Sequence, residues 1–201
     1  MKFRQMCYRC HRPAKLCLCE HIVPVDTRTK FVLLIHPKEY KRIKNNTGRL
    51  THLSLPNSEL FTGVDFTQHT RLNAILDNPK NSCYILYPSS DSTPLHEVQL
   101  PEQDKQLVIL LIDATWSSAK PILRLSKNLH TLPKISFNHT KTSAYTFKRQ
   151  PFCEALSTME STHCVLEILQ QKAYENIPAE KVAHFLDPFH EIVKYQVNFK
   201  P

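Results

Sequence analysis

Four cysteines near the start of the sequence are spaced like the ligands of one metal ion. Cys7 and Cys10 form a C-x2-C pair, and Cys17 and Cys19 form a C-x-C pair shortly after it. Thiolates at such spacings can converge on a tetrahedral Zn²⁺, with backbone amides pointing at the sulfurs. All four metal positions would be filled by cysteine, which leaves none open for water or substrate. We therefore predict a structural zinc knuckle within residues 1–24.

Two other interpretations of this cluster are less favoured. The segment 7–11 also fits the C-x-x-C-H pattern of covalent haem attachment, but that chemistry belongs to exported proteins and leaves Cys17 and Cys19 unexplained. Disulfides are disfavoured in a reducing cytosol. The remaining cysteines have apolar neighbours and are expected to be small buried hydrophobic residues: Cys83, Cys153 and Cys164.

A second group that could do chemistry is Asp113-Ala114-Thr115-Trp116, which follows an apolar run and contains the only tryptophan. It can place a carboxylate beside a flat aromatic surface at the start of a helix. Alternatively, Asp113 or Thr115 caps a helix that begins near Ser117, and Trp116 belongs to the core. From the spacing alone the two interpretations are equally favoured.

Three apolar runs are expected to form the strands that position these residues. Residues 29–36, 83–87 and 107–113 have the continuous apolar character of central parallel strands. Helical patterns at 67–76 and 117–125 lie between or after them, which predicts an α/β fold with a mostly parallel sheet flanked by helices. Ligands of such sheets bind beyond the carboxyl ends of the strands. The residues at those ends are His36-Pro37, Tyr87-Pro88 and Asp113 to Trp116.

The rest of the chain is expected to be mainly helical. A turn at residues 45–50 can begin a helix that ends before Pro56, and residues 157–174 and 179–194 have apolar residues at helical spacing. Residues 91–105 are the most loop-like stretch. No linker divides the chain, so we expect one domain, with the knuckle at 1–24 and an α/β core with C-terminal helices at 25–201.

Composition excludes several classes of protein. The longest apolar run, 107–112, is strand-sized, and residues 1–6 lack the apolar region of a secretory signal, so we expect a cytoplasmic protein that does not span a membrane. The formal charge of +8 attracts polyanions. Gly48 and Gly63 are the only glycines, so no glycine-rich phosphate loop can form. This favours a nucleotide-like cofactor without phosphates, such as S-adenosylmethionine.

Four motifs in order resemble those of the DTW-domain family, the tRNA-uridine aminocarboxypropyltransferases. They are the cysteine cluster, the segment 46–50 (NTGRL), the D-x-T-W motif at 113–116 and Ser157-Thr158-x-Glu160, and the match extends from Cys7 to about Glu167. One departure is Ser161, where a small alanine is expected.

The resemblance implies transfer of the 3-amino-3-carboxypropyl group of S-adenosylmethionine to N3 of a uridine in tRNA, with release of methylthioadenosine. It also implies a fold related to the knotted SPOUT methyltransferases. Chain knots are rare enough that physical reasoning alone would not suggest one.

The implied chemistry assigns roles to the residues of the D-x-T-W motif. Uridine N3 holds its proton too tightly to be a nucleophile at neutral pH, so a base must share that proton, and we assign this role to Asp113. Thr115 and Trp116 belong to the same catalytic segment. Trp116 can stack on uracil or adenine, or simply pack.

Other residues are candidates for holding the donor. Arg49 or Arg149 can grip its α-carboxylate at two points, and Glu160 can meet its α-ammonium. Ser157 either contacts the ligand or, with Glu160, forms the capping box of the following helix. The adenine needs an apolar slot, which we expect from Tyr87-Pro88 and a loop at 132–137 that begins with Leu132.

Basic side chains are candidates for tRNA phosphate contacts, although a run of charges is usually a solvated face. They are Lys38, Lys41, Arg42, Lys44 and Lys148. Two other functions stay open at this point. A SPOUT-type RNA methyltransferase would share the cofactor but release S-adenosylhomocysteine, and a non-catalytic zinc-knuckle RNA-binding module would bind no cofactor.

Overall fold

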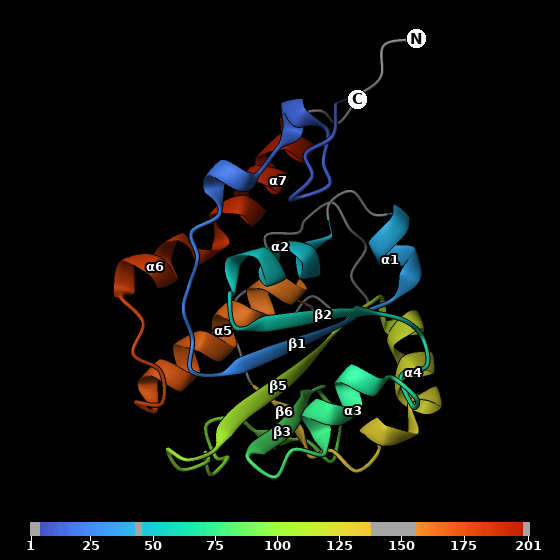
Figure 1. The fold of residues 1–201 in the computed structure, drawn as a ribbon. Coiled ribbons are helices and arrows are strands. Elements are labelled where there is room, and N and C mark those ends of the chain that lie inside the picture. Colours follow the sequence, from blue (N-terminus) through green and yellow to red (C-terminus); the bar gives the residue numbers. More distant parts are fainter. Residues whose placement is uncertain (1–4, 43–45, 138–155, 199–201) are drawn as a thin grey trace.

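The computed structural model describes residues 5–42, 46–137 and 156–198, which form a parallel sheet covered by helices on both faces (Figure 1). The six strands lie in the order β2-β1-β5-β3-β6-β4, and all their pairings are parallel. Their bounds are β1 Lys30–Ile35, β2 Ser58–Thr62, β3 Asn81–Leu86, β4 Thr93–Pro94, β5 Gln106–Asp113 and β6 Lys134–Ser136. The predicted α/β class with a parallel sheet is confirmed.

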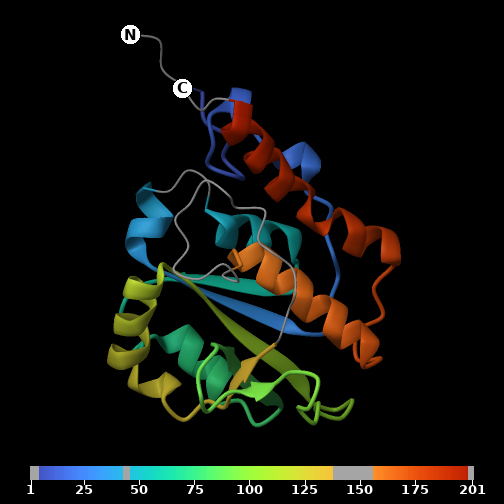
Figure 2. The ribbon, with the colours of Figure 1, turned by 180° about the vertical axis from the view of Figure 1, so that it is seen from behind.

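The helices form one layer on each face of this sheet. In the described residues, α2, α5, α6 and α7 cover one face, and α3 and α4 lie on the other (Figures 1 and 2). The helix bounds are α1 Pro37–Arg42, α2 Thr47–Ser54, α3 Thr70–Leu76, α4 Trp116–Leu125, α5 Thr158–Gln171, α6 Ala179–Ala183 and α7 Asp187–Asn198. Short 3-10 turns span Ala14–Leu16, Cys19–His21, Lys127–Leu129 and His184–Leu186.

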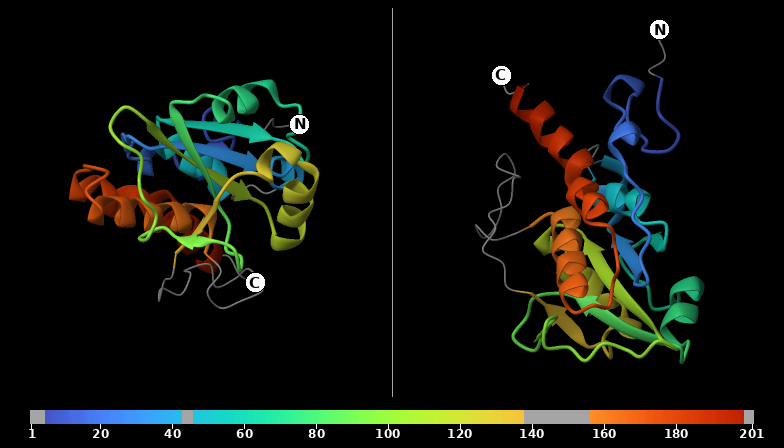
Figure 3. Two further views of the ribbon diagram at one scale, coloured as in Figure 1. Left: turned by 90° about the horizontal axis from the view of Figure 1, so that it is seen from below. Right: turned by 90° about the vertical axis from the view of Figure 1, so that its left-hand side faces the viewer.

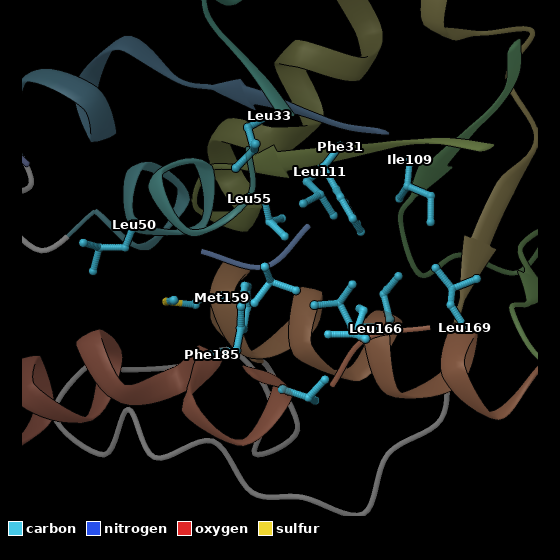
Figure 4. Close-up of a cluster of buried hydrophobic side chains, with 14 of the residues drawn as sticks. Phe31, Leu33, Leu50, Leu55, Ile109, Leu111, Met159, Leu166, Leu169 and Phe185 are labelled. Carbon is cyan, nitrogen blue, oxygen red and sulfur yellow. The ribbon is translucent and has the colours of Figure 1, made fainter. Parts of the chain in front are cut away.

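Strict alternation of side chains along the central strands produces two hydrophobic cores. Phe31, Leu33 and Ile35 of β1 pack toward α2 and α5, whereas Val32 and Leu34 pack toward α3 and α4. Successive side chains of a strand point to opposite faces, so a strand covered on both sides must be apolar throughout. Figure 4 shows the first core, in which Leu55, just after α2, and Leu166 of α5 meet the side chains of β1 and β5. Each fully buried residue of this size contributes about 1.5–3 kcal/mol.

A buried carboxylate after α5 fixes the beginning of β1. Glu175 accepts hydrogen bonds from the backbone N–H groups of Arg28 at 2.9 Å and Thr29 at 2.7 Å. Its neighbour Tyr174 accepts a hydrogen bond from the backbone of Leu107 at 3.2 Å, at the start of β5. The carboxyl-terminal end of α5 is thereby fixed at the amino edge of the two central strands, which leaves its first turn at their carboxyl edge.

The sequence patterns predicted the central strands closely and the periphery less well. The predicted strands at 29–36, 83–87 and 107–113 correspond to β1, β3 and β5, and the predicted helices at 67–76, 117–125 and 157–174 to α3, α4 and α5. Residues 179–194 are not one helix. They divide into α6, a 3-10 turn and the start of α7, and Pro188 lies in the first turn of α7, where a missing N–H is tolerated.

Three further details were not foreseen. The charged run that follows β1 forms α1, the loop-like stretch 91–105 contains β4, and the expected loop at 132–137 contains β6. The knot implied by the family resemblance stays a prediction. Within the described part of the chain, no helix has the length and apolar character needed to cross a membrane.

Candidate active site

The carboxyl ends of β1 and β5 lie side by side and form the floor of the candidate site. Ile35 pairs with Asp113, and the backbone N–H of His36 donates to the Asp113 carbonyl at 3.2 Å. Helices α1 and α4 begin within three residues of these strand ends (Figure 1). Residues that follow either strand are therefore brought to one edge of the sheet, as the parallel arrangement predicted.

The side chain of Asp113 joins this edge to two other segments of the chain. Asp113 is 8% exposed. Oδ1 accepts a hydrogen bond from the Thr158 hydroxyl at 2.6 Å, and Oδ2 accepts one from the side-chain amide of Asn46. A buried carboxylate is costly unless it is hydrogen-bonded, and the positive N-terminal ends of helices further favour it. Because Asn46 and Thr158 stand at the starts of α2 and α5, Asp113 fixes both helices to the end of β5.

Gly48 lies directly against this carboxylate. A Cβ atom added at Gly48 would be 2.6 Å from Oδ2 of Asp113 and 2.7 Å from its Cγ. Carbon and oxygen atoms that are not bonded do not approach so closely. The first turn of α2 can therefore contact Asp113 only because position 48 has no side chain.

Asn46 also caps α2 and thereby connects Asp113 to Arg49. The Oδ1 atom of Asn46 accepts the backbone N–H of Arg49 at 2.7 Å, a standard N-cap hydrogen bond. The Arg49 guanidinium lies over the ring of Tyr40 in α1, 4.4 Å from its centroid, and donates to the Tyr40 carbonyl at 3.2 Å. A guanidinium has five N–H donors, and the bond to the Tyr40 carbonyl is the one hydrogen bond that they make to the described residues. A partly exposed cation therefore stands three residues after Asn46, the residue that donates to Asp113.

The start of α5 is held by the capping box that its sequence indicated. The backbone N–H of Glu160 donates to the Ser157 hydroxyl at 3.3 Å, and the backbone N–H of Ser157 donates to Glu160 Oε2 at 2.8 Å. Glu160 is 8% exposed. The capping interpretation of Ser157 and Glu160 is confirmed, and their contact with a donor molecule stays a prediction.

The rest of the D-x-T-W motif begins α4. Thr115 is the N-cap residue, but within the described parts of the chain its hydroxyl bonds with the hydroxyls of Ser117 and Ser118, both at 3.0 Å, instead of capping a backbone N–H. Thr115 is exposed and Trp116 is the first helical residue. Asp113 does not serve as the cap of α4, because its side chain is directed to Asn46 and Thr158.

The residues proposed to form the adenine slot are only partly brought together. The backbone N–H of Tyr87 donates to Ile135 at 3.0 Å, so the end of β3 lies beside β6. Leu132 precedes β6 and packs with the α3 and α4 face, so it lies short of the carboxyl edge at which Tyr87 and Pro88 stand.

The basic candidates lie in α1 or outside the described residues. Lys38 is exposed at the first turn of α1. Lys41 and Arg42 belong to the same helix. Lys44, Lys148 and Arg149 lie outside the described residues, so the proposed phosphate and carboxylate contacts of these residues stay predictions.

The cysteine cluster has the geometry of a metal site. The Sγ atoms of Cys7 and Cys19 are 3.7 Å apart, those of Cys10 and Cys17 are 3.8 Å apart, and all four lie within 4.8 Å of one another. Four sulfurs bound tetrahedrally to one zinc would be separated by ~3.8 Å. Backbone hydrogen bonds from Cys10 and Arg9 lower the pKa of Cys7 to about 6, whereas burial and the neighbouring thiols raise the pKa of Cys19 above its ordinary value.

The other described cysteines fit the expected packing role. Cys164 is buried, and Cys83 is half-buried between β3 and α3. Burial raises the pKa of Cys83 to about 11, so its thiol is protonated at neutral pH. Cys153 lies outside the described residues.

Comparison with known families matches residues 4–197 to the DTW domain. The chain belongs to the DTW domain family. The family suggested by the sequence motifs is thereby confirmed, and the match covers almost the whole chain. No solved structure was found to match the chain.

The curated relatives of this DTW protein described next are all named for the same activity. A Drosophila melanogaster protein named tRNA-uridine aminocarboxypropyltransferase 2 is 33% identical over 97% of this chain and 76% of its own length. A Mus musculus protein of the same name is 31% identical over 84% of this chain, and the Arabidopsis thaliana tRNA-uridine aminocarboxypropyltransferase A is 29% identical over 62% of it. The chain spans little more than half the length of the latter two, 57% and 52%.

The contact of Gly48 with Asp113 generates a prediction about stability. Replacing glycine by alanine inside a helix normally stabilises it by about 0.5–1 kcal/mol. At Gly48 we expect the opposite sign, a loss of ~2 kcal/mol or more, because the new methyl group overlaps the Asp113 carboxylate. Urea unfolding of Gly48→Ala against the unchanged protein measures this difference.

The matched control is Gly63→Ala at the other glycine. Its Cβ would be 3.0 Å from the ring edge of Phe66, a less severe overlap than the 2.6 Å at Gly48, so a smaller loss is expected. Equal or greater stability of Gly48→Ala would show that α2 does not press against Asp113.

Proposed function

We propose that this protein is a cytoplasmic tRNA-uridine aminocarboxypropyltransferase that uses S-adenosylmethionine. The observation that supports it most is the meeting of three family motifs at one carboxylate. Asn46 and Gly48, Asp113, and Thr158 come from three segments far apart in the sequence. Residues needed only for separate helix starts would have no reason to converge at the carboxyl edge of the sheet, where α/β proteins bind ligands.

The reaction requires one proton transfer and one displacement. When bound, S-adenosylmethionine supplies an aminocarboxypropyl carbon attached to a positively charged sulfur, which keeps the bonding electron pair and leaves as methylthioadenosine. The new bond forms between that carbon and uridine N3. The N3 proton must be removed as this bond forms, and we assign it to the Asp113 carboxylate.

Arg49 is the described residue best suited to hold the donor's α-carboxylate. It is a partly exposed cation whose ring contact with Tyr40 and backbone contact orient the guanidinium at the start of α2. A planar guanidinium can bind a carboxylate at two points, which fixes the reacting carbon in place. Arg149 remains the alternative for this role. Glu160 is proposed for the α-ammonium, in addition to its hydrogen bond in the capping box.

The test of this function is mass spectrometry of nucleosides from unmodified tRNA after incubation with the protein and S-adenosylmethionine. We expect an aminocarboxypropyl adduct on uridine and an equal amount of methylthioadenosine. A methyl adduct with S-adenosylhomocysteine would identify an RNA methyltransferase instead. No adduct on any tRNA, with RNA binding retained, would identify a binding module.

Asp113→Asn is the matched variant for the same assay. The Thr158 hydroxyl can accept as well as donate, so an asparagine can keep both hydrogen bonds and the fold. We expect transfer to be abolished while S-adenosylmethionine affinity stays within a few-fold of the unchanged protein. Retained turnover would remove Asp113 from the role of base.

We further propose that the cysteine cluster holds a structural Zn²⁺. The four thiolates would complete its coordination, which leaves no position for a substrate. Among residues 5–24, the ion would stabilise a segment that contributes only two buried side chains, Leu18 and Ile22, to the main core.

Removal of this metal should destabilise the protein. Cys17→Ser or a strong chelator is expected to remove about one zinc per chain and to lower the melting temperature, since the energy of metal binding contributes to folding. Metal analysis and thermal unfolding measure the two effects. Cys83→Ala is the control, and its zinc content should be unchanged. Full metal loss with an unchanged melting temperature and lost transfer would mean that the metal acts in the reaction.

A further inference from the structure

The metal knuckle presents an aromatic side chain to solvent. Tyr8 is 97% exposed, although it stands between two metal-ligating positions, Cys7 and Cys10. It lies in a turn closed by hydrogen bonds from the His11 N–H to the Cys7 carbonyl at 2.9 Å and from the Cys7 N–H to the Arg12 carbonyl at 2.8 Å. The backbone of Tyr8 is thus fixed while its ring contacts almost nothing in the described parts of the chain.

Exposed hydrophobic side chains gather at this end of the molecule. The large hydrophobic residues most exposed in the described parts of the chain are Met6, Tyr8, Leu125 and Tyr195. Met6 and Tyr8 belong to the knuckle, and Tyr195 belongs to α7, a helix that contacts the 3-10 turn Cys19–His21 of the knuckle. Figure 3 shows the same pair of segments extending beyond the sheet. Leu125 is at the end of α4, on the opposite face of the sheet.

Two cations accompany the exposed ring. Arg9 and Lys15 are exposed, and in the part of the chain that the structure describes neither forms an ion pair. Several other lysines do pair with carboxylates, namely Lys30, Lys134, Lys181 and Lys194. The one acid of the knuckle, Glu20, is 3.4 Å from His21.

We infer that the knuckle is a contact site for an unpaired nucleotide of the RNA, with the base stacked on Tyr8 and neighbouring phosphates bound by Arg9 and Lys15. Aromatic stacking and phosphate contacts are the means by which proteins bind unpaired RNA bases. A ring whose backbone is already fixed loses little conformational freedom when a base stacks on it. The inference rests on the proposed function only in taking tRNA as the RNA.

The experiment measures the affinity of the metal-loaded full chain for unmodified tRNA. Labelled tRNA is titrated with the protein at ~0.1 M salt, and its fluorescence anisotropy reports binding. We expect Tyr8→Ala to weaken binding about tenfold, since stacking contributes on that scale. Tyr8→Phe keeps the ring and should bind within about twofold of the unchanged protein. Arg9→Ala should weaken binding and reduce the slope of log affinity against log salt by about one.

Controls separate this contact from folding and from the chemistry. All the variants should keep their metal content and melting temperature, because the side chains that they change are exposed. Leu125→Ala changes an exposed hydrophobic residue outside the knuckle and α7, and it should leave tRNA affinity unchanged. Loss of affinity in Tyr8→Ala without any transfer activity in the unchanged protein would support the RNA contact while rejecting the proposed function.

Two results would overturn the inference. Unchanged tRNA affinity in Tyr8→Ala would mean that the ring serves another partner, such as a protein, or none. Equal weakening by Tyr8→Phe and Tyr8→Ala would show that stacking is not the source of the effect.

Discussion

The buried carboxylate of Asp113 is the interaction on which the candidate site depends. It ends the central strand β5 and accepts hydrogen bonds from Asn46 at the start of α2 and Thr158 at the start of α5. A charge in this position is tolerated because both oxygens are hydrogen-bonded and the positive ends of helices are near. Through these two bonds the starts of both helices are joined to the sheet edge. The close approach of Gly48 to Asp113 shows how tightly the start of α2 packs against the end of β5.

Much of the fold was predictable because its central strands are covered on both faces. Such strands must be apolar throughout, and β1, β3 and β5 stand in the sequence as continuous apolar runs. The strands β2, β4 and β6 were missed because they are short or half-buried and carry little periodic signal. The break between α6 and α7 had a local signal in Pro188, which ordinarily ends or begins a helix.

The candidate site was predictable in its parts but not in its connections. The cysteine spacing predicted a four-thiolate cluster, and the capping box predicted the start of α5. The partners of Asp113 could not be found by local spacing, because Asn46 is 67 residues before it and Thr158 is 45 residues after it. Only the joint presence of their motifs in one family connected them. The exposure of Tyr8 could not be predicted either, since a tyrosine between two cysteines can be packed or exposed.

A double-mutant cycle of Asn46 and Asp113 tests the hydrogen bond between these two side chains most directly, with thermal unfolding as the measurement of stability. Asn46→Asp should be strongly destabilising, by ~3 kcal/mol or more, because it buries a second carboxylate against the first. Adding Asp113→Asn exchanges donor and acceptor, and the aspartate introduced at position 46 remains a good N-cap, so stability should return to within about 1 kcal/mol of the unchanged protein. If the stability losses of the two single variants simply add in the double variant, the side chains of Asn46 and Asp113 do not form this hydrogen bond.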